Sequence, residues 1–415
     1  MNKRDILIFI FIIIQPILDL MTALGGESPV SVGALAKSLL MLFLWLYIVH
    51  YLWTKKRRLL WLFISTYLAI LLMLIVNIIF KSHYDLFAEI HFAFKTSYYL
   101  VILYTATLLI ESKQLNKRLI DQAVTVNSII IGVSYWLAII SGTSIESYAY
   151  EGVGYAGWFF SANELSVIII LLLGILLARF QEGPALSTWV AFLLLVSMLP
   201  MIGTKTAFIG GVLLLIIYTL YLLGKYRLRM LQNKNSILFI GVVIIFFCLL
   251  PVTPIMSNTA PAETKQIQET TEPQTMDVSP LIQKILSSRH LYLQETKDDF
   301  MEADILRKAF GLGYAGDYEQ EPKIIEMDFF DLFFSYGIIG AILLLLPLVY
   351  VTVKVFPLKL TMAKIILLFT LSLCFGVAFL AGHVLFAPAV MTYVAITYIA
   401  LGLENKMSCN GKAES

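Results

Sequence analysis

Long uninterrupted apolar stretches recur along this chain. A helix that crosses a lipid bilayer needs about 20 apolar residues in succession, and each stretch approaches or reaches that length. The composition agrees, because 59% of the 415 residues are hydrophobic and only 14% are charged, against about 25% charged residues in soluble proteins. The sequence therefore predicts an all-α polytopic membrane protein.

Twelve stretches qualify as candidate spans. The first follows a short basic head, as the apolar part of a signal peptide does, but it contains Gln15, Pro16 and Asp19. Because it also runs directly into a second stretch, we expect it to be retained. The three cysteines imply no disulfide framework. The candidate spans are residues 5–23, 31–53, 59–80, 91–110, 119–141, 164–179, 186–203, 206–223, 236–253, 329–352, 365–380 and 389–403.

The basic residues predict the orientation, since cytoplasmic loops of membrane proteins carry an excess of Lys and Arg. Alternate connections carry 19 of the 30 Lys and Arg residues, and the short loops on the other side carry almost none, with Lys81 as the main exception. Both termini are therefore expected in the cytoplasm. The net charge of +2 mostly reflects this topology, so we expect no nucleic-acid partner.

The connection between spans nine and ten, residues 254–328, is long and polar, and the orientation places it outside. Its first part is rich in Thr, Pro, Glu and Gln, as disordered segments are. Its second part has apolar residues at helical spacing and a candidate helix N-cap at Ser287 or Ser288, which predicts one or two amphipathic helices on the outer membrane surface. The chain thus divides into spans one to nine (1–253), this loop, and spans ten to twelve with a cytoplasmic tail (329–415).

Five charged residues within or between spans fall toward the outer leaflet: Asp19, Lys37, Lys95, Glu164 and Lys205. Ionisable residues in a membrane usually face a polar cavity and pair with one another. Asp19 and Lys37 fit a structural ion pair between neighbouring helices better than a catalytic pair. The clustering of charges on one side predicts a polar chamber that opens to the outside beneath the long loop.

The asymmetry of the chain favours an enzyme over a transporter. An alternating-access transporter commonly has its site near the bilayer midplane, between two matching halves. Here the charges are peripheral, the halves share no visible repeat, and one large loop lies on one face. The five histidines lack metal-ligand spacing, and Glu326 and Asp328 are too few carboxylates for a metal site, so we expect no cofactor.

The segment EMDFFDLFFSYGIIG places three carboxylates, Glu326, Asp328 and Asp331, at the threshold of span ten. Asp328 suits a helix N-cap as well as it suits a binding site. Asp331 lies one turn later on the same face and is less easily explained as a cap. Gly337 and Gly340 indicate close helix packing more than chemistry.

Five segments occur in an order that resembles the O-antigen ligase and O-antigen polymerase superfamily of bacterial membrane glycosyltransferases. The similarity covers about residues 150–345, and the hydropathy profile extends it to the whole chain. The segments are GWFFSANELS (157–166), GTKTAFIGG (203–211), SSRHLYLQ (287–294), GLGY (311–314) and EMDFFDLFFSYGIIG (326–340).

The resemblance implies a GT-C-like helical bundle in the bacterial plasma membrane, with the loop helices roofing a lateral groove for lipid. It also implies an inverting-type glycosyltransferase that takes glycan from an undecaprenyl-diphosphate-linked donor on the outer face. The acceptor would be a sugar hydroxyl on a glycan or lipid-linked molecule. The protein would thus be a cell-envelope polysaccharide polymerase or ligase, in contact with membrane lipids and other polysaccharide-assembly proteins.

The family's residues carry over in part. Arg289 matches an Arg near the start of the loop helix, and Asn163 matches an Asn near the start of the sixth span. Lys205 stands where the family often has an Arg after the seventh span. The family's ligases have a His-Asn pair eleven residues before the first of two late glycines, but Glu326 and Met327 stand there in this chain. This departure favours a polymerase or a separate ligase-like branch.

The implied chemistry suits these residues. Arg289 and Lys205 would stabilise the negative charge that develops on the lipid diphosphate as the sugar–phosphate bond breaks. Glu326 would be the general base for the acceptor hydroxyl. Its aromatic neighbours Phe329 and Phe330 would make it more basic by disfavouring its charged form.

Asp331 is the fourth residue that we assign to catalysis, through orientation of the acceptor or of Arg289. The residues assigned to substrate binding are Asp328, Asn163, Glu164 and Lys95. Two other functional classes stay open: a lipid-linked oligosaccharide flippase or transporter, and a non-catalytic assembly partner of a polysaccharide machinery.

Overall fold

The computed structural model of the chain describes residues 3–25, 31–81, 83–112, 115–148, 153–226, 232–259, 289–317, 324–356 and 359–410. Within these residues, long helices are joined by short connections, and two short strands, β1 (Ile145–Glu146) and β2 (Tyr155–Gly157), pair antiparallel. The long helices are α1 (Lys3–Leu24), α2 (Val32–Lys55), α3 (Arg57–Phe80), α4 (Leu86–Glu111), α5 (Lys117–Ile140), α6 (Ala162–Arg179), α7 (Leu186–Met201), α8 (Lys205–Tyr226), α9 (Lys234–Leu249), α14 (Asp328–Val355), α15 (Met362–Leu380) and α16 (Pro388–Asn410). The short helices are α10 (Pro254–Thr259), α12 (Arg289–Glu302) and α13 (Ile305–Phe310), and 3₁₀ turns cover Phe180–Glu182 and Leu250–Val252.

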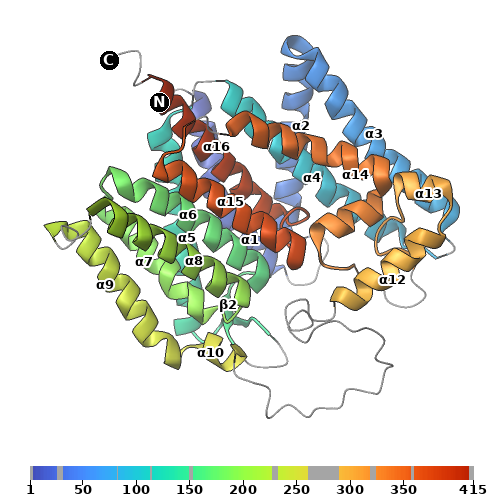
Figure 1. Cartoon of the computed structure of the whole chain (residues 1–415). Helices are drawn as coiled ribbons and strands as arrows, with labels where there is room; N and C mark the ends of the chain where they lie inside the picture. Colours follow the sequence, from blue (N-terminus) through green and yellow to red (C-terminus); the bar gives the residue numbers. More distant parts are fainter. Residues whose placement is uncertain are drawn as a thin grey trace.

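The long helices coincide with the twelve predicted spans. Ten helices among the described residues are long and apolar enough to cross a membrane. The two other predicted spans correspond to α7, an apolar helix of 16 residues, and to α16. The predicted all-α polytopic membrane fold is therefore confirmed (Figure 1).

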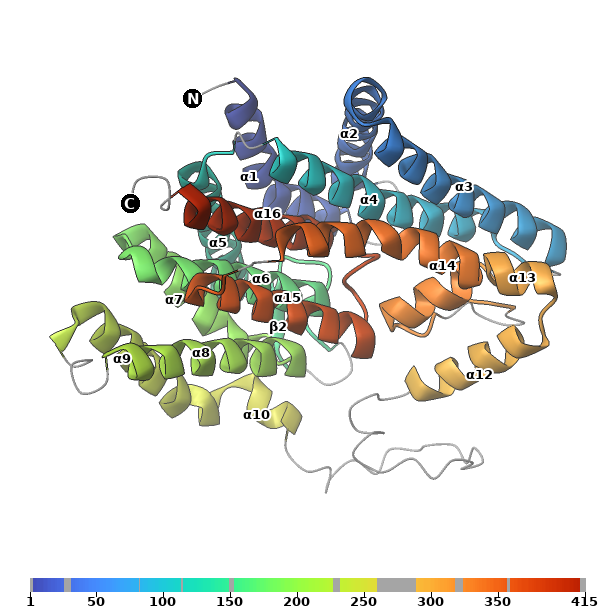
Figure 2. The same ribbon diagram turned by 45° about the horizontal axis from the view of Figure 1, so that its top comes forward.

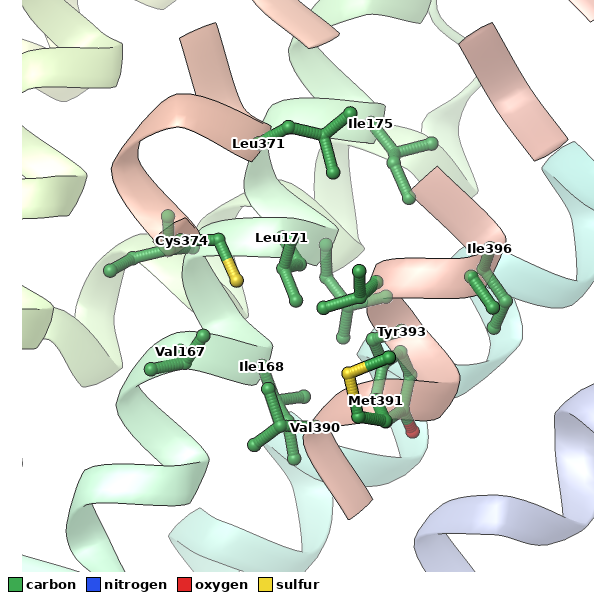
Figure 3. Packing of buried hydrophobic residues seen from close by; sticks show 14 of the residues in the cluster. Val167, Ile168, Leu171, Ile175, Leu371, Cys374, Val390, Met391, Tyr393 and Ile396 are labelled. Carbon is green, nitrogen blue, oxygen red and sulfur yellow. The ribbon is translucent and has the colours of Figure 1, made fainter. Parts of the chain in front are cut away.

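Helix α6 lies in the middle of the bundle. From Val167 to Ala178 it is apolar on every side, which is typical of a helix enclosed by other helices. Every residue from Leu165 to Ala178 is buried, and α6 packs against α7, α8, α15 and α16. Figure 3 shows side chains of three of these helices in one cluster, including Leu171 of α6, Cys374 of α15 and Ile396 of α16.

Ion pairs join connections that the sequence assigns to the same side of the membrane. Lys117 at the start of α5 pairs with Glu182 after α6 and with Glu404 near the end of α16. Lys56, between α2 and α3, pairs with Glu111 at the end of α4. Both chain termini lie toward this end of the bundle, and α10 and α12 lie away from it (Figures 1 and 2). The predicted grouping of connections is thus observed, and its assignment to the cytoplasm stays a prediction.

The second part of the long connection folds as α12 and α13, as its helical spacing predicts. In the first part, residues 254–259 form the short helix α10, contrary to the disorder that its composition predicts. Residues 260–288, with the cap predicted at Ser287 or Ser288, lie outside the described residues. The ring of Phe300 in α12 packs against Phe333 and Phe334 of α14, and α13 packs against α14 and α3. Both helices therefore dock on the end of the bundle, whereas their position at the membrane surface stays a prediction.

Helix α14 is broken at Gly337, where the backbone has φ 66° and ψ −174°. The break removes the helical partners of the carbonyl groups just before it, which must find other donors. The amides of Leu312 and Gly313 supply them, at 2.8 Å to the Phe334 carbonyl and 3.1 Å to the Ser335 carbonyl. The GLGY segment of the loop is thus hydrogen-bonded to the broken helix.

A buried ion pair fixes the end of the GLGY segment. Lys81, the exception in the predicted distribution of basic residues, lies 2.5 Å from Glu89 of α4, and both side chains are buried. The Lys81 ammonium group also donates to the Tyr314 carbonyl, and Glu89 accepts from the Tyr314 amide. The positive charge of Lys81 is therefore neutralised locally, and it ties the loop to α3 and α4.

Candidate functional site

Charged side chains from four helices line one cavity. Asp19 of α1, Lys37 of α2, Lys95 of α4 and Glu164 of α6 surround a space of about 300 Å³ near the end of the bundle that carries the loop helices. These are four of the five residues from which the sequence predicts a polar chamber. The chamber is present, and its opening to the cell exterior stays a prediction.

Two of the charged side chains in the cavity pair with each other, and two do not. Lys37 donates a hydrogen bond to Asp19 and forms the interhelical ion pair that the sequence predicts. Among the described residues, the side chains of Lys95 and Glu164 have no hydrogen-bond or ion-pair partner, although Glu164 interacts at longer range with both lysines. One carboxylate and one ammonium group are therefore available to a ligand in the cavity.

Arg289, Glu326 and His383 form a second cluster. The Arg289 Nη2 atom donates to the Glu326 Oε2 atom at 2.9 Å, and the His383 Nε2 atom lies 3.9 Å from the same oxygen. The Arg289 Nε atom is buried and has no hydrogen-bond partner among the described residues. A buried donor without a partner is costly, which makes this edge of the guanidinium group a candidate for ligand binding.

Two residues of this cluster have a strained backbone. Glu326 has φ 62° and His383 has φ 63°, values that side-chain-bearing residues rarely adopt. Asp331 accepts hydrogen bonds from the amides on both sides of Glu326, those of Ile325 and Met327, at 3.0 and 2.9 Å. The turn that presents the Glu326 side chain is thus held from inside the bundle.

Asp328 supports the strained backbone at His383 in the same way. Its Oδ2 atom accepts from the amides of Val384 and Leu385, directly after His383, at 2.7 and 2.8 Å. Both aspartates are buried. Their carboxylates hold the backbone, and this arrangement supports a positioning role for each.

The structure contradicts two expectations, the N-cap role of Asp328 and the apolar surrounding of Glu326. Met327 is the N-cap of α14, and Asp328 is its first helical residue, with a carboxylate that faces another connection. Glu326 is also not enclosed by the two phenylalanines that follow Asp328, since its side chain is 37% exposed and paired with Arg289. The Glu326 carboxylate therefore faces the positive charge of Arg289 and not an apolar surrounding.

His383 connects the cluster to the cavity. It lies between α15 and α16, and Pro388, five residues later, lines the cavity. Burial lowers the pKa of His383, Glu326 opposes that shift, and Arg289 and Lys95 reinforce it. The connection between α15 and α16 thus borders the cavity at Pro388 and the cluster at His383, so the two parts form one site.

Lys205 and Asn163 lie beside this site. Lys205 begins α8, has an exposed side chain and is not among the described residues that line the cavity. Its neighbour Thr204 shares a 2.6 Å hydrogen bond with Ser166 of α6. Asn163, in the first turn of α6, is half-buried and also outside the cavity lining.

His383 is the member of the site that the sequence does not reveal. It stands in a short, mostly apolar connection between two spans, and only the fold brings it to Glu326. The spacing of His383 from the other histidines does not suggest a metal site. Within the described residues, no group of three or more His, Cys, Asp or Glu side chains converges as a metal site requires.

Comparison with known protein families gives one match. The model of a family described as O-antigen ligase like membrane protein matches residues 1–275 and 259–405. Comparisons with curated proteins and with solved structures gave no match. The family match covers nearly the whole chain and agrees with the helical bundle and with the resemblance seen in the sequence. The chain belongs to the O-antigen ligase-like family of membrane proteins.

Proposed function

We propose that this protein transfers a glycan from an undecaprenyl-diphosphate donor to a hydroxyl group of an acceptor sugar at the outer face of the bacterial plasma membrane. The family supports a membrane polysaccharide ligase or polymerase. The sequence favours polymerisation onto a second lipid-linked glycan, because the family's ligase histidine is replaced at Glu326.

The proposal rests on one observation, the incomplete hydrogen bonding of the Arg289 guanidinium group. One edge of its guanidinium group pairs with Glu326, and its buried Nε atom has no hydrogen-bond partner among the described residues. A guanidinium group binds phosphate oxygens through parallel hydrogen bonds. The exposed Lys205 adds positive charge at the start of α8.

These residues suit a single displacement. Glu326 takes the proton of the acceptor hydroxyl, and the acceptor oxygen attacks the anomeric carbon of the donor sugar. The bond from that carbon to the diphosphate oxygen breaks, and its electron pair leaves with the lipid diphosphate. Arg289 and Lys205 stabilise the charge on this leaving group. Attack from the opposite face inverts the anomeric configuration.

Glycan chain length in a deletion strain that carries each variant tests the proposal. Glu326→Gln should lower extension roughly 10²–10⁴-fold and leave a small residual rate, the effect of losing a general base. Arg289→Lys keeps the charge but loses the planar fork, and should lower extension about tenfold or more, since a hydrogen bond to a charged group contributes roughly 1.5–3 kcal/mol. Lys205→Ala should impair extension, and Lys205→Arg should largely retain it.

Controls come from exposed residues outside the site. Glu302→Gln in α12 and Arg58→Lys in α3 make the same chemical changes on exposed side chains and should leave chain length unchanged. All variants must reach wild-type levels in the membrane. Wild-type glycan in both Glu326→Gln and Arg289→Lys would contradict the proposal. Movement of lipid-linked glycan across liposomes without new glycosidic bonds would indicate a flippase instead.

A further inference from the structure

The cavity beside Arg289 has a balanced lining. Asp19 and Glu164 contribute two carboxylates, and Lys37 and Lys95 contribute two ammonium groups. A diphosphate is best bound by a surplus of positive charge, whereas this lining offers acceptors and donors in equal measure. Such a lining suits a neutral ligand with many hydroxyl groups, because each hydroxyl both donates and accepts hydrogen bonds.

Aromatic rings complete the lining. Phe94 of α4 and the consecutive Phe159 and Phe160 before α6 border the same cavity. Phe159 is buried, but Phe160 is 64% exposed and stands at the polar cavity. A sugar ring has an apolar face of C–H groups that packs on an aromatic ring, and hydroxyl groups at its edge that bind charged side chains. Aromatic rings and carboxylates around one cavity therefore match a saccharide.

The size of the cavity limits the ligand. Its volume of about 300 Å³ lies at the lower end of the roughly 300–1,000 Å³ that small-molecule sites occupy. It can take a single sugar ring but not a lipid-linked glycan with its diphosphate. The lipid and the diphosphate of the donor must therefore lie outside it, on the Arg289 side.

We propose that this cavity is a saccharide subsite for the acceptor, and that it holds the sugar ring whose hydroxyl group is glycosylated. The unpaired Glu164 accepts hydrogen bonds from ring hydroxyls, Lys95 donates to one of them, and Phe160 packs on the apolar face. Because the connection between α15 and α16 borders the cavity at Pro388 and reaches Glu326 at His383, a ring in this position directs its free edge toward Glu326. This assignment to the acceptor rests on the function proposed above.

Binding of simple probes to the purified full chain in lipid nanodiscs tests the subsite. The saccharide probes are the methyl glycosides of glucose, galactose, rhamnose and N-acetylglucosamine, observed by saturation-transfer NMR. The diphosphate probe is inorganic pyrophosphate, observed by calorimetry. At least one glycoside should bind wild type, and Glu164→Gln and Phe160→Ala should each weaken it about tenfold, the effect of losing roughly 1.4 kcal/mol. Phe43→Ala, which removes a ring that is 66% exposed on α2 and outside the cavity lining, should leave it unchanged.

The two probes separate this inference from the proposed function. Pyrophosphate binding should fall in Arg289→Lys and persist in Glu164→Gln and Phe160→Ala. The subsite is overturned if no glycoside binds, if Glu164→Gln and Phe160→Ala both bind it like wild type, or if pyrophosphate competes with it directly. One outcome would support the saccharide subsite and refute the diphosphate role of Arg289. In it, glycoside binding depends on Glu164, and pyrophosphate binding is unchanged by Arg289→Lys.

Discussion

The strained pair Glu326 and His383 shows how single residues shape this site. A non-glycine residue in the left-handed region costs of order 1–3 kcal/mol and persists only where its surroundings enforce it. Here Asp331 and Asp328 together accept four backbone hydrogen bonds beside the strained residues. Hydrogen bonds to charged groups contribute roughly 1.5–3 kcal/mol each, enough to offset the strain. The two aspartates thus keep Glu326 and His383 face to face.

Asp331→Asn tests this positioning at the residue scale. Asp331 uses one oxygen for each amide, so an asparagine loses one of the two hydrogen bonds and directs an NH₂ group at a backbone donor. Glycan extension should fall about tenfold to a hundredfold, in line with the loss of one hydrogen bond to a charged group. Asp298→Asn, on an exposed position of α12, is the matched control.

A double-mutant comparison distinguishes positioning from a general loss of folding. If Asp331 acts through Glu326, then adding Asp331→Asn to Glu326→Gln should reduce extension no further. Additive losses at equal membrane levels would show that Asp331 acts independently of Glu326.

At the scale of elements, the sequence predicts the helices far better than the breaks within them and the contacts between them. Apolar stretches mark each span directly, because membrane helices are specified by local composition. The charges within them also predicted the cavity, since an ionisable residue in an apolar stretch needs a polar neighbour. The break at Gly337 and its pairing with Leu312 and Gly313 were not predicted. Their cause is a contact between distant segments, which no local pattern encodes.

Gly337→Ala tests the joint between α14 and the loop. A β-carbon at Gly337 would lie 2.5 Å from the Gly311 amide nitrogen and 2.6 Å from the Ala309 carbonyl, and φ is +66°. The left-handed conformation alone costs roughly 1–2 kcal/mol, so thermal unfolding in detergent should begin at a clearly lower temperature, and proteolysis of the loop should accelerate.

Gly376→Ala is the matched control in α15. A β-carbon at Gly376 would meet no neighbouring atom of the described residues within 4 Å, and alanine stabilises a helix by roughly 0.5–1 kcal/mol relative to glycine. Thermal stability should therefore stay the same or rise slightly. Equal unfolding temperatures for Gly337→Ala and wild type would show that the joint does not require glycine.

At the scale of the whole molecule, the two ends of the bundle have different tasks. One end carries the ion pairs of Lys117 and Glu111 and both termini, and the other carries the cavity, the Arg289 cluster and the loop helices. The sequence could predict this division because basic residues mark one set of connections. It could not predict that Asp328 would reach the connection after His383, since these residues meet only when the helices pack.

Labelling of single cysteines tests which end faces the outside. In a background without Cys248, Cys374 and Cys409, Glu302→Cys in α12 and Gln232→Cys before α9 both place a thiol at an exposed position. A membrane-impermeant maleimide added to intact cells should modify Glu302→Cys and spare Gln232→Cys, because the 19 basic residues assign the Gln232 end to the cytoplasm. In lysed cells both should react, which controls for accessibility. Equal labelling in intact cells would remove the argument for an external site. The reverse pattern would place the cavity and Arg289 on the cytoplasmic side, where transfer at the outer face of the membrane is impossible.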